Sequence, residues 1–209
     1  MQLEVYLSLH FPVNILRSIS EQMEDLIRQS IEGSSLISPG DRVLVAISGG
    51  ADSTALLHAL SRLGSQMGFS VSAAHLNHGM RHAASREAMQ VSNLCRDLGV
   101  TCVFGDEDVQ AYASTAKKGV EEAGRELRYS FLREAARMCV CNRIATAHHQ
   151  QDQAETLIMR LARGTSVSGL TGIPERNLPF IRPLLMAERR QVEAYLQRHG
   201  LSWSEDESN

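Results

Sequence analysis

Two hydrophobic patterns alternate along the chain and predict its elements. From Pro12 to residue 32, apolar side chains recur at helical spacing, which predicts an amphipathic helix packed on the outside of the main domain. A turn over residues 38–41 then leads into the continuous apolar run Val43-Leu44-Val45-Ala46-Ile47. A short run of this kind suits a strand that is buried on both faces, as in a parallel sheet.

Strand and helix patterns alternate four times after the first helix, which predicts an α/β fold with a doubly wound parallel sheet and helices on both faces. In such sheets ligands bind beyond the carboxyl ends of the strands. Between the third strand and Lys118 we expect a polar loop. The later strands are expected over 71–75, 101–104 and 143–147, and the helices over 54–63, 85–98, 120–138, 153–163 and 188–198.

The 209 residues suffice for one domain with a sizeable core. We expect an N-terminal helical extension over 1–40 and a catalytic domain over 41–209, whose last part, 164–209, is rich in turns and helix. A net charge of -3 gives no global argument for nucleic-acid binding. The N-terminus lacks a signal-peptide pattern, and no apolar run is long enough to span a bilayer. The four cysteines show no disulfide spacing, so we expect a cytoplasmic protein without a membrane partner.

The first candidate chemistry follows the strand that ends at Ile47, in the loop Ser48-Gly49-Gly50-Ala51-Asp52-Ser53. Paired glycines let backbone N–H groups approach an anion, the next helix adds a partial positive charge, and both serines can donate to phosphate oxygens. The loop has no lysine, so it is not a Walker A motif. Asp52 beside phosphates calls for Mg²⁺ to offset the repulsion. The alternative is a plain strand-to-helix turn with Asp52 or a serine as cap.

This stretch resembles the PP-loop of the N-type ATP pyrophosphatase superfamily, whose members cleave ATP between the α and β phosphates. The resemblance implies an adenine nucleotide alpha hydrolase-like, Rossmann-like fold and Mg²⁺·ATP as cofactor. Further motifs narrow the choice within the superfamily. They are His75-Leu76-Asn77-His78-Gly79-Met80-Arg81, the stretch 120–129, the stretch 144–156, Arg160 to Gly164, Gly169-Leu170, Arg182-Pro183-Leu184-Leu185 and Asp206-Glu207-Ser208-Asn209.

Together these motifs are similar to the catalytic, N-terminal domain of the tRNA(Ile)-lysidine synthetase family, from Gly40 to the end of the chain. The resemblance implies a ligase that adenylates C2 of the wobble cytidine in tRNA(Ile) with a CAU anticodon. It then replaces the AMP with the ε-amine of free lysine. Three positions depart from the family, Ala147, Gln151 and Glu207, where Gly, Asp and Pro are usual. The downstream tRNA-recognition domains known in many members are expected to be absent from this chain.

Several side chains have a candidate role in that reaction. Asp152 and Glu155 share a helix face and could seat a cationic amine, although helix capping explains the pair equally well from spacing alone. His148, at a strand end, could contact a phosphate or accept a proton. Arg125 and Arg128 could stabilise the triphosphate or the adenylated cytidine, or could form ion pairs on a solvated helix face.

Other residues are given weaker roles by the same resemblance. His75 and Asn77 are expected to edge the adenosine pocket, and Arg81 to face RNA. A metal site at the histidines 75, 78 and 82 or at Cys139 and Cys141 is disfavoured, because the spacing does not fit zinc or a cluster. A weak basic surface for RNA phosphates is expected from Arg160, Arg163, Arg182, Arg189 and Arg190.

Two other functions stay open. A tRNA thiolase of the same superfamily would activate a base in the same way but deliver sulfur, and the acidic pair Asp152/Glu155 with no C-x-x-C motif favours an amine instead. A nucleotide-binding module without turnover would need the glycines but not the acidic pair. The sequence leaves the oligomeric state open, with a homodimer among the states considered.

Overall fold

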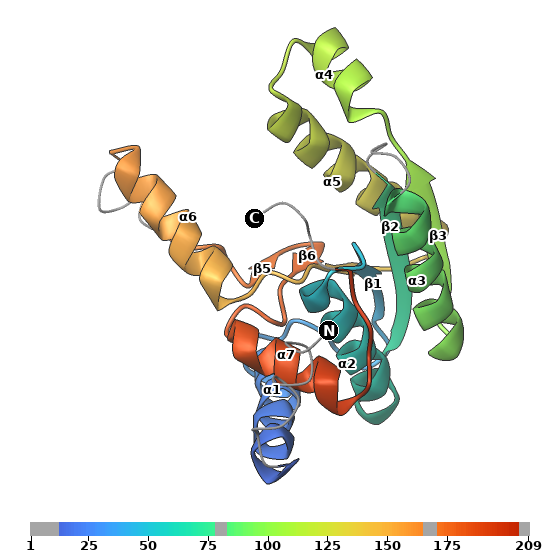
Figure 1. Cartoon of the computed structure of the whole chain (residues 1–209), viewed down its shortest axis with the longest axis vertical. Coiled ribbons are helices and arrows are strands. Elements are labelled where there is room, and N and C mark those ends of the chain that lie inside the picture. Colours follow the sequence, from blue (N-terminus) through green and yellow to red (C-terminus); the bar gives the residue numbers. More distant parts are fainter. Residues whose placement is uncertain (1–12, 78–82, 165–170, 205–209) are drawn as a thin grey trace, which may run out of the picture.

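The centre of the molecule is a six-stranded sheet with the order β3-β2-β1-β4-β6-β5. The computed structural model describes residues 13–77, 83–164 and 171–204. Figure 1 shows the sheet with helices around it. All pairings are parallel except that of β5 with β6, which is antiparallel. The strands are β1 (Arg42–Ala46), β2 (Ser70–Asn77), β3 (Cys102–Asp106), β4 (Arg143–Ala145), β5 (Arg176–Asn177) and β6 (Phe180–Ile181).

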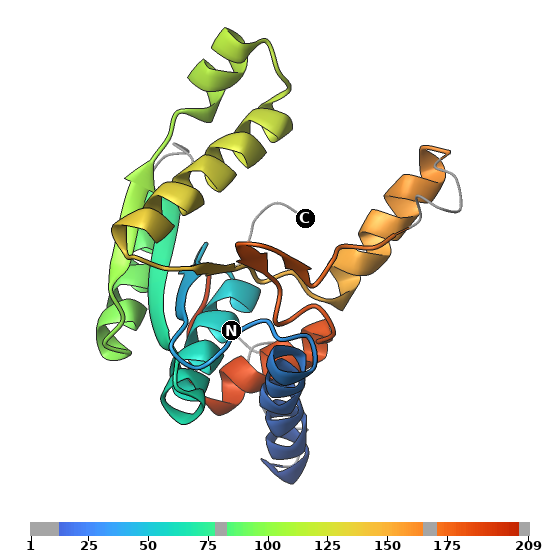
Figure 2. The same ribbon diagram turned by 180° about the vertical axis from the view of Figure 1, so that it is seen from behind.

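Helices cover both faces of this sheet, as the alternating pattern predicts. On one face the core contains side chains of α1, α2, α3 and α7, and on the other face α5 supplies the covering side chains. Figure 2 shows the two layers from behind. The helices are α1 (Val13–Gly33), α2 (Ala51–Met67), α3 (Ala83–Asp97), α4 (Val109–Ala116), α5 (Val120–Met138), α6 (Gln150–Ala162) and α7 (Arg189–Arg198).

β1 is buried on both faces of the sheet, as its continuous apolar run predicts. Val43 and Val45 are buried in the larger core with α2 and α7, whereas Leu44, between them, is buried in the core under α5. Successive side chains of a strand point to opposite faces. A strand covered on both sides therefore has no position at which a polar side chain would meet water.

The segment before Lys118 contains a helix where the sequence predicted a polar loop. α4 starts at Asp108, whose Oδ1 atom accepts a hydrogen bond from Ala111 N at 2.9 Å. Only Val109 and Ala113 of α4 are buried, and they pack on Ala123 of α5. Only two apolar residues thus mark the buried face of α4, which is too few to show helical periodicity in the sequence. The loop prediction was wrong for this reason.

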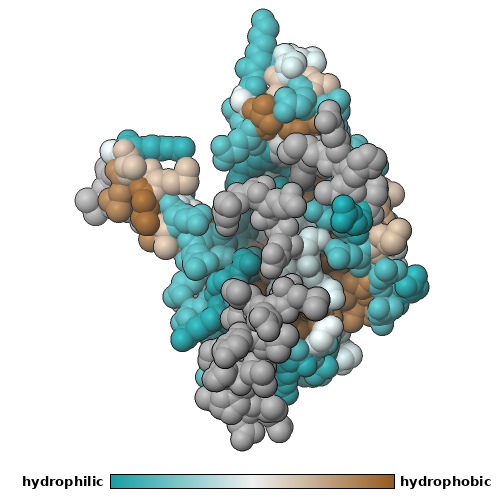
Figure 3. Space-filling view, in the orientation of Figure 1, coloured by the Kyte–Doolittle hydropathy of each residue, from teal (hydrophilic) through white to brown (hydrophobic). Residues whose placement is uncertain are grey.

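α6 projects from the body of the molecule (Figures 1 and 2). None of its thirteen residues, all of which the structure describes, is buried. Ile158, Met159 and Leu161 are exposed, and Figure 3 shows hydrophobic colouring on this projection. The base of α6 lies at the carboxyl edge of the sheet, where the candidate site forms.

Several predicted features lie outside the described residues. These are the RNA-facing Arg81, the histidines His78 and His82, the Gly169-Leu170 motif and the departure at Glu207.

Candidate active site

A tight loop joins β1 to α2 at the carboxyl edge of the sheet. Gly49 has a φ of 97°, which residues with a Cβ rarely adopt, so the turn needs glycine here. Ser48 N donates to Ser53 Oγ at 3.1 Å, and Ser53 Oγ donates to Gly50 O at 3.1 Å. Gly50 caps α2 without a side-chain bond, and the first N–H groups of a helix have no intrahelical partner. The loop therefore has the geometry of an anion-binding helix start.

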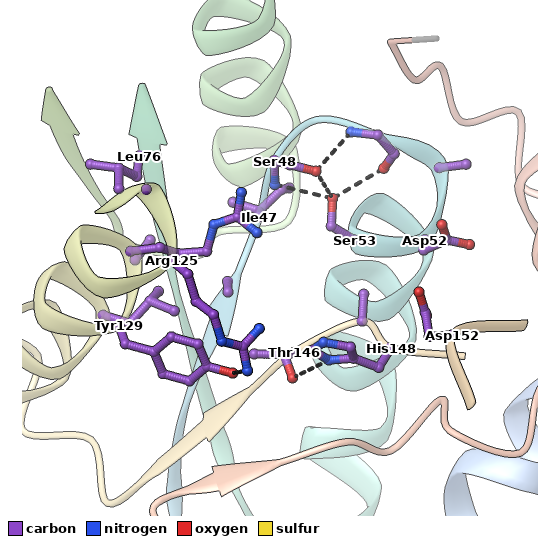
Figure 4. Close-up of a pocket in the computed structure, with 18 of the residues that line it drawn as sticks. Ile47, Ser48, Asp52, Ser53, Leu76, Arg125, Tyr129, Thr146, His148 and Asp152 are labelled. Atoms are coloured by element: carbon purple, nitrogen blue, oxygen red, sulfur yellow. Dashed lines mark hydrogen bonds between the residues drawn. The ribbon is translucent and has the colours of Figure 1, made fainter. Parts of the chain in front are cut away.

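This loop opens into a cavity of about 940 Å³, near the upper end of the usual range for small-molecule sites. Figure 4 shows lining side chains that converge from β1, α2, α5 and the segment after β4. Gly49 is not among the lining residues, and its carbonyl accepts a hydrogen bond from Ser204 N at 2.9 Å. The predicted residues that line the cavity are Ser48, Gly50, Ala51, Asp52, Ser53, Arg125, Arg128, His148 and Asp152.

Asp52 places a carboxylate in the first turn of α2, beside the loop. Its Oδ2 atom lies 3.3 Å from Arg189 Nη1 and 3.7 Å from His149 Nε2. Burial raises the pKa of Asp52 above its ordinary value, and the charges of His149 and Arg189 oppose this shift. Within the described chain, the buried Oδ1 atom has no hydrogen-bond partner. A buried carboxylate oxygen without a donor is unusual and fits a site for a cation.

Two histidines and Asp152 follow β4. Thr146 Oγ1 and His148 Nδ1 are 2.9 Å apart. Burial lowers the pKa of His148, with Arg182 adding to the effect, so the imidazole is neutral near pH 7. Asp152 Oδ2 accepts from His149 N at 2.7 Å, and His149 Nδ1 accepts from Gln151 N at 3.1 Å. The bond to Asp152 Oδ2 is part of the capping box of α6, so Asp152 both lines the cavity and caps the start of the helix.

The opposite side of the cavity is positively charged. Arg125 and Arg128 extend from α5, and Figure 4 shows Arg125 with Tyr129 across the cavity from Asp52 and Asp152. Arg125 Nη2 donates to Tyr129 Oη at 3.3 Å, and its guanidinium carbon lies 4.9 Å from the centre of that ring. Contact with an aromatic ring holds the guanidinium in place. The cavity therefore has Arg125 and Arg128 on α5, with Glu121 of the same helix, across from Asp52 and Asp152 on α2 and α6.

With this geometry in view, the comparisons with known proteins decide the family. A family model described as a PP-loop domain matches residues 16–209. The chain belongs to the PP-loop domain family. We therefore call the loop at residues 48–53 the PP-loop.

Curated relatives of this PP-loop chain share one name. The tRNA(Ile)-lysidine synthase of Thermosipho africanus is 42% identical over 87% of the chain and 42% of its own length. Those of Clostridium perfringens and Petrotoga mobilis are 41% and 37% identical over 90% and 91% of the chain. The chain spans 40% of the Clostridium protein and 61% of the Petrotoga protein.

Solved structures share the PP-loop chain's fold at low sequence identity. The U34-tRNA thiolase NcsA of Methanococcus maripaludis, solved with its 4Fe-4S cluster, has a TM-score of 0.75 at 16% identity, over 90% of this chain and 67% of that one. An NH3-dependent NAD synthetase of Campylobacter jejuni has a TM-score of 0.55 at 18% identity, over 89% of this chain and 74% of that one. These likenesses support the mostly parallel α/β fold.

Three of the predicted site residues do not line the cavity. His75 is buried, its Nδ1 lies 2.9 Å from Ile47 O, and Asn77 Nδ2 donates to Asp106 Oδ1 at 2.8 Å. Neither lines the cavity, whereas Ala74 and Leu76 do, because alternate residues of β2 face opposite sides of the sheet. The place of His75 and Asn77 at the edge of the adenosine pocket stays a prediction. Glu155 is exposed on α6 and is not among the lining residues.

Sequence reasoning missed three residues that complete the PP-loop side of the cavity. Arg189, Trp203 and Ser204 line it, although they follow the loop by more than a hundred residues. Ser204 N binds Gly49 O, and Ser204 Oγ donates to Gln90 Oε1 at 2.6 Å. No local pattern indicates this return of the chain.

The predicted basic surface does not form as one patch. Arg182 is 5% exposed, and its Nη1 donates to Pro174 O at 2.6 Å, so it belongs to the interior. Arg189 faces the PP-loop instead, and Arg160 Nη1 donates to Thr171 Oγ1 at 2.8 Å. Arg163 and Arg190 are exposed. The five arginines therefore do not form one surface, and that prediction was wrong. The positions of arginines in a sequence do not show which of them are buried.

The four cysteines, all within the described ranges, lie outside the lining of the cavity. Ala147, one of the three departures, does line it. In the part of the chain that the structure describes, no helix combines the length and apolar character that crossing a bilayer requires.

Proposed function

We propose that this chain binds ATP in the cavity and ligates lysine to C2 of the wobble cytidine in tRNA(Ile) with a CAU anticodon. The observation that carries the proposal is the cavity itself, which the PP-loop, two arginines of α5 and Asp152 line together. Relatives named tRNA(Ile)-lysidine synthase, about 40% identical over most of the chain, support the same reaction. The reaction belongs in the cytoplasm.

Two bond exchanges make up the proposed reaction. The C2 oxygen of the cytidine attacks the α-phosphorus of ATP, the bond from Pα to the bridging oxygen breaks, and pyrophosphate leaves. The lysine ε-amine then attacks C2, and AMP leaves with the former C2 oxygen. The amine loses protons during this step, so a base must stand near it.

The chain's own residues fit these tasks. The PP-loop N–H groups bind the departing phosphates, and Arg125 and Arg128 offset the negative charge of the adenylate. Asp152 attracts the lysine ammonium. His148, neutral because burial lowers its pKa, accepts a proton from the amine.

Mg²⁺ fits the same site through Asp52. The buried Oδ1 atom, which lacks a hydrogen-bond partner within the described residues, is an oxygen donor of the kind that Mg²⁺ takes. When bound with ATP, the ion would reduce the charge on the phosphates.

The proposal is tested by pyrophosphate release. Purified protein is given ATP and Mg²⁺ with lysine, with a CAU-anticodon transcript, with both, with neither, and with the transcript and a sulfur donor. Release that requires both lysine and the transcript supports lysidine formation. Release that needs the transcript and a sulfur donor but ignores lysine would instead support the thiolase alternative. No release under any condition would support a nucleotide-binding module.

The position of the cysteines bears on the thiolase alternative. A thiolase that works through cysteine needs a thiol near the activated base. None of the four cysteines, which the structure describes in full, lines the cavity. An acidic side chain, Asp152, is there instead, and it suits an amine.

A further inference from the structure

The PP-loop supplies little positive charge to offset the charge of the pyrophosphate leaving group. Pyrophosphate departs as a multiply charged anion, yet residues 48–53 contain no lysine or arginine and one acid, Asp52. Backbone N–H groups and the start of α2 supply only about half an elementary charge. Mg²⁺ at Asp52 would offset part of this charge, and a cationic side chain beside the loop would offset more of it.

Three arginines stand among the described residues that line the cavity, and one of them is near the loop. Arg125 and Arg128 belong to α5 on the other face of the sheet, where Arg125 contacts Tyr129. Arg189, the first residue of α7, reaches the loop side, with Nη1 at 3.3 Å from Asp52 Oδ2. Arg189 thus has the position of such a cationic side chain.

Arg189 is also held in a fixed direction. Its Nε donates to Glu193 Oε1 at 2.9 Å, one helical turn along α7. The backbone beneath it is anchored, because Val192, Tyr195 and Leu196 are fully buried. A guanidinium fixed through Nε presents its Nη edge to the loop, in the planar form that suits phosphate oxygens.

We propose that Arg189 binds the pyrophosphate portion of ATP and stays with it as the leaving group. As the bond between Pα and the bridging oxygen breaks, the electron pair goes to pyrophosphate, and Arg189 offsets the added charge. The inference rests on the proposed function only in that ATP is cleaved between its α and β phosphates. It needs neither lysine nor tRNA.

The competing explanation is structural, since the contacts of Arg189 with Asp52 and Glu193 also join α7 to α2. The two explanations differ in what a substitution changes. A joining role affects stability and all ligands alike, whereas a pyrophosphate contact affects pyrophosphate alone.

Ligand binding can be followed without activity, because the single tryptophan, Trp203, lines the cavity. The full chain is titrated with inorganic pyrophosphate and, separately, with AMP, both with MgCl₂, and Trp203 fluorescence is recorded. For Arg189→Gln we expect pyrophosphate affinity to fall about ten- to a hundredfold and AMP affinity to change less than about twofold. Arg189→Lys, which keeps the charge but not the planar fork, is expected to fall between.

The matched control is Arg190→Gln. Arg190 neighbours Arg189, pairs with Glu188 and is not among the lining residues, so its loss changes net charge equally and should leave both affinities unchanged. Arg189→Gln that binds pyrophosphate like the parent overturns the proposal, as does equal loss of both ligands. If Arg189→Gln does not fold, Arg189→Lys decides by the same criteria. A parent chain that binds no pyrophosphate overturns this inference and the PP-loop part of the proposed function, whereas a failed lysine assay leaves this inference standing.

Discussion

Asp152 serves the fold and the candidate site with one carboxylate. It closes the capping box of α6 through His149 N, and it lines the cavity. Glu155 lies one turn further along α6, is exposed and is absent from the described lining. At the scale of single residues, neutralising these two acids should therefore have different effects, although they share a helix face.

We expect Asp152→Asn to raise the lysine concentration for half-maximal rate about ten- to a hundredfold, because a charge-assisted contact contributes about 1.5–3 kcal/mol. Asparagine keeps an oxygen that can accept from His149 N, so α6 should still start correctly. Glu155→Gln is the matched control and should change the lysine requirement less. Rates are measured while lysine and ATP are varied separately. Equal increases in both requirements for Asp152→Asn would indicate a structural role.

A second prediction concerns Asp52, whose buried Oδ1 atom fits a cation. Asp52→Asn should keep the fold but raise the Mg²⁺ concentration needed for ATP-dependent pyrophosphate release by about tenfold or more, because the metal loses an anionic ligand. Asp97→Asn, at an exposed carboxylate at the end of α3, removes the same charge and should change nothing. Turnover of Asp52→Asn at the parent rate over the whole Mg²⁺ titration would contradict the assignment.

At the scale of elements, α1, α2 and α7 meet at a half-buried polar cluster. His58 Nδ1 lies 2.8 Å from Tyr195 Oη, which donates to Glu24 Oε1 at 3.0 Å, and the His199 ring is 4.7 Å from that of His58. Met23 and Ile27 of α1 are fully buried in the same core as Tyr195. The cluster thus ties three helices together, including the one that carries Arg189.

Acid should weaken this junction. Burial lowers the pKa of His58 from 6.5 to about 4, so below pH 6.5 the unfolded chain takes up a proton that the folded chain does not. The free energy of unfolding is therefore full above pH 6.5 and falls toward pH 4, by at most about 1.4 kcal/mol per pH unit and less for a partly exposed group. His58→Gln should flatten this dependence in urea unfolding curves. An unchanged slope in the variant would assign the effect elsewhere.

Some elements could be predicted from the sequence, and others could not. The long helix that was predicted over about 120–138 is α5, with the same bounds. α4 was missed since only Val109 and Ala113 mark its buried face. Which residues of β2 line the cavity could not be read from the sequence, because a strand that is buried on both faces gives no sign of which side chains face a ligand. Arg189 and Trp203 needed tertiary structure, since only the packing of α7 brings them to the PP-loop.

At the scale of the whole molecule, α4 with α5 and α6 extend on either side of the carboxyl edge of the sheet (Figures 1 and 2). The net charge of -3 means that attraction to a polyanion must come from local patches. The predicted patch is divided, with Arg182 buried and Arg189 turned to the PP-loop.

We therefore expect this chain to bind ATP well but tRNA weakly, with tRNA affinity that falls steeply between ~50 and ~200 mM salt. The chain spans 40% and 61% of the length of two of the relatives it matches. Titration of labelled tRNA(Ile) at both salt concentrations checks this, with a transcript of altered anticodon as control and Trp203 fluorescence for ATP. Tight, anticodon-selective binding at the higher salt would show that these residues suffice for recognition.

α6 is a projecting helix whose N-terminal end is attached to the body of the molecule (Figures 1 and 2). The capping box holds it at His149, and hydrogen bonds join Gln153 to Ile173 and Arg160 to Thr171, while none of its described residues is buried. Thirteen residues of helix measure about 20 Å, so a tilt of about 10° about the N-terminal end moves the tip about 3 Å and Asp152 less than about 1 Å. A macromolecule that contacts the exposed side chains of Ile158 and Leu161 can thus move the end of α6. The Asp152 carboxylate keeps its place at the cavity meanwhile.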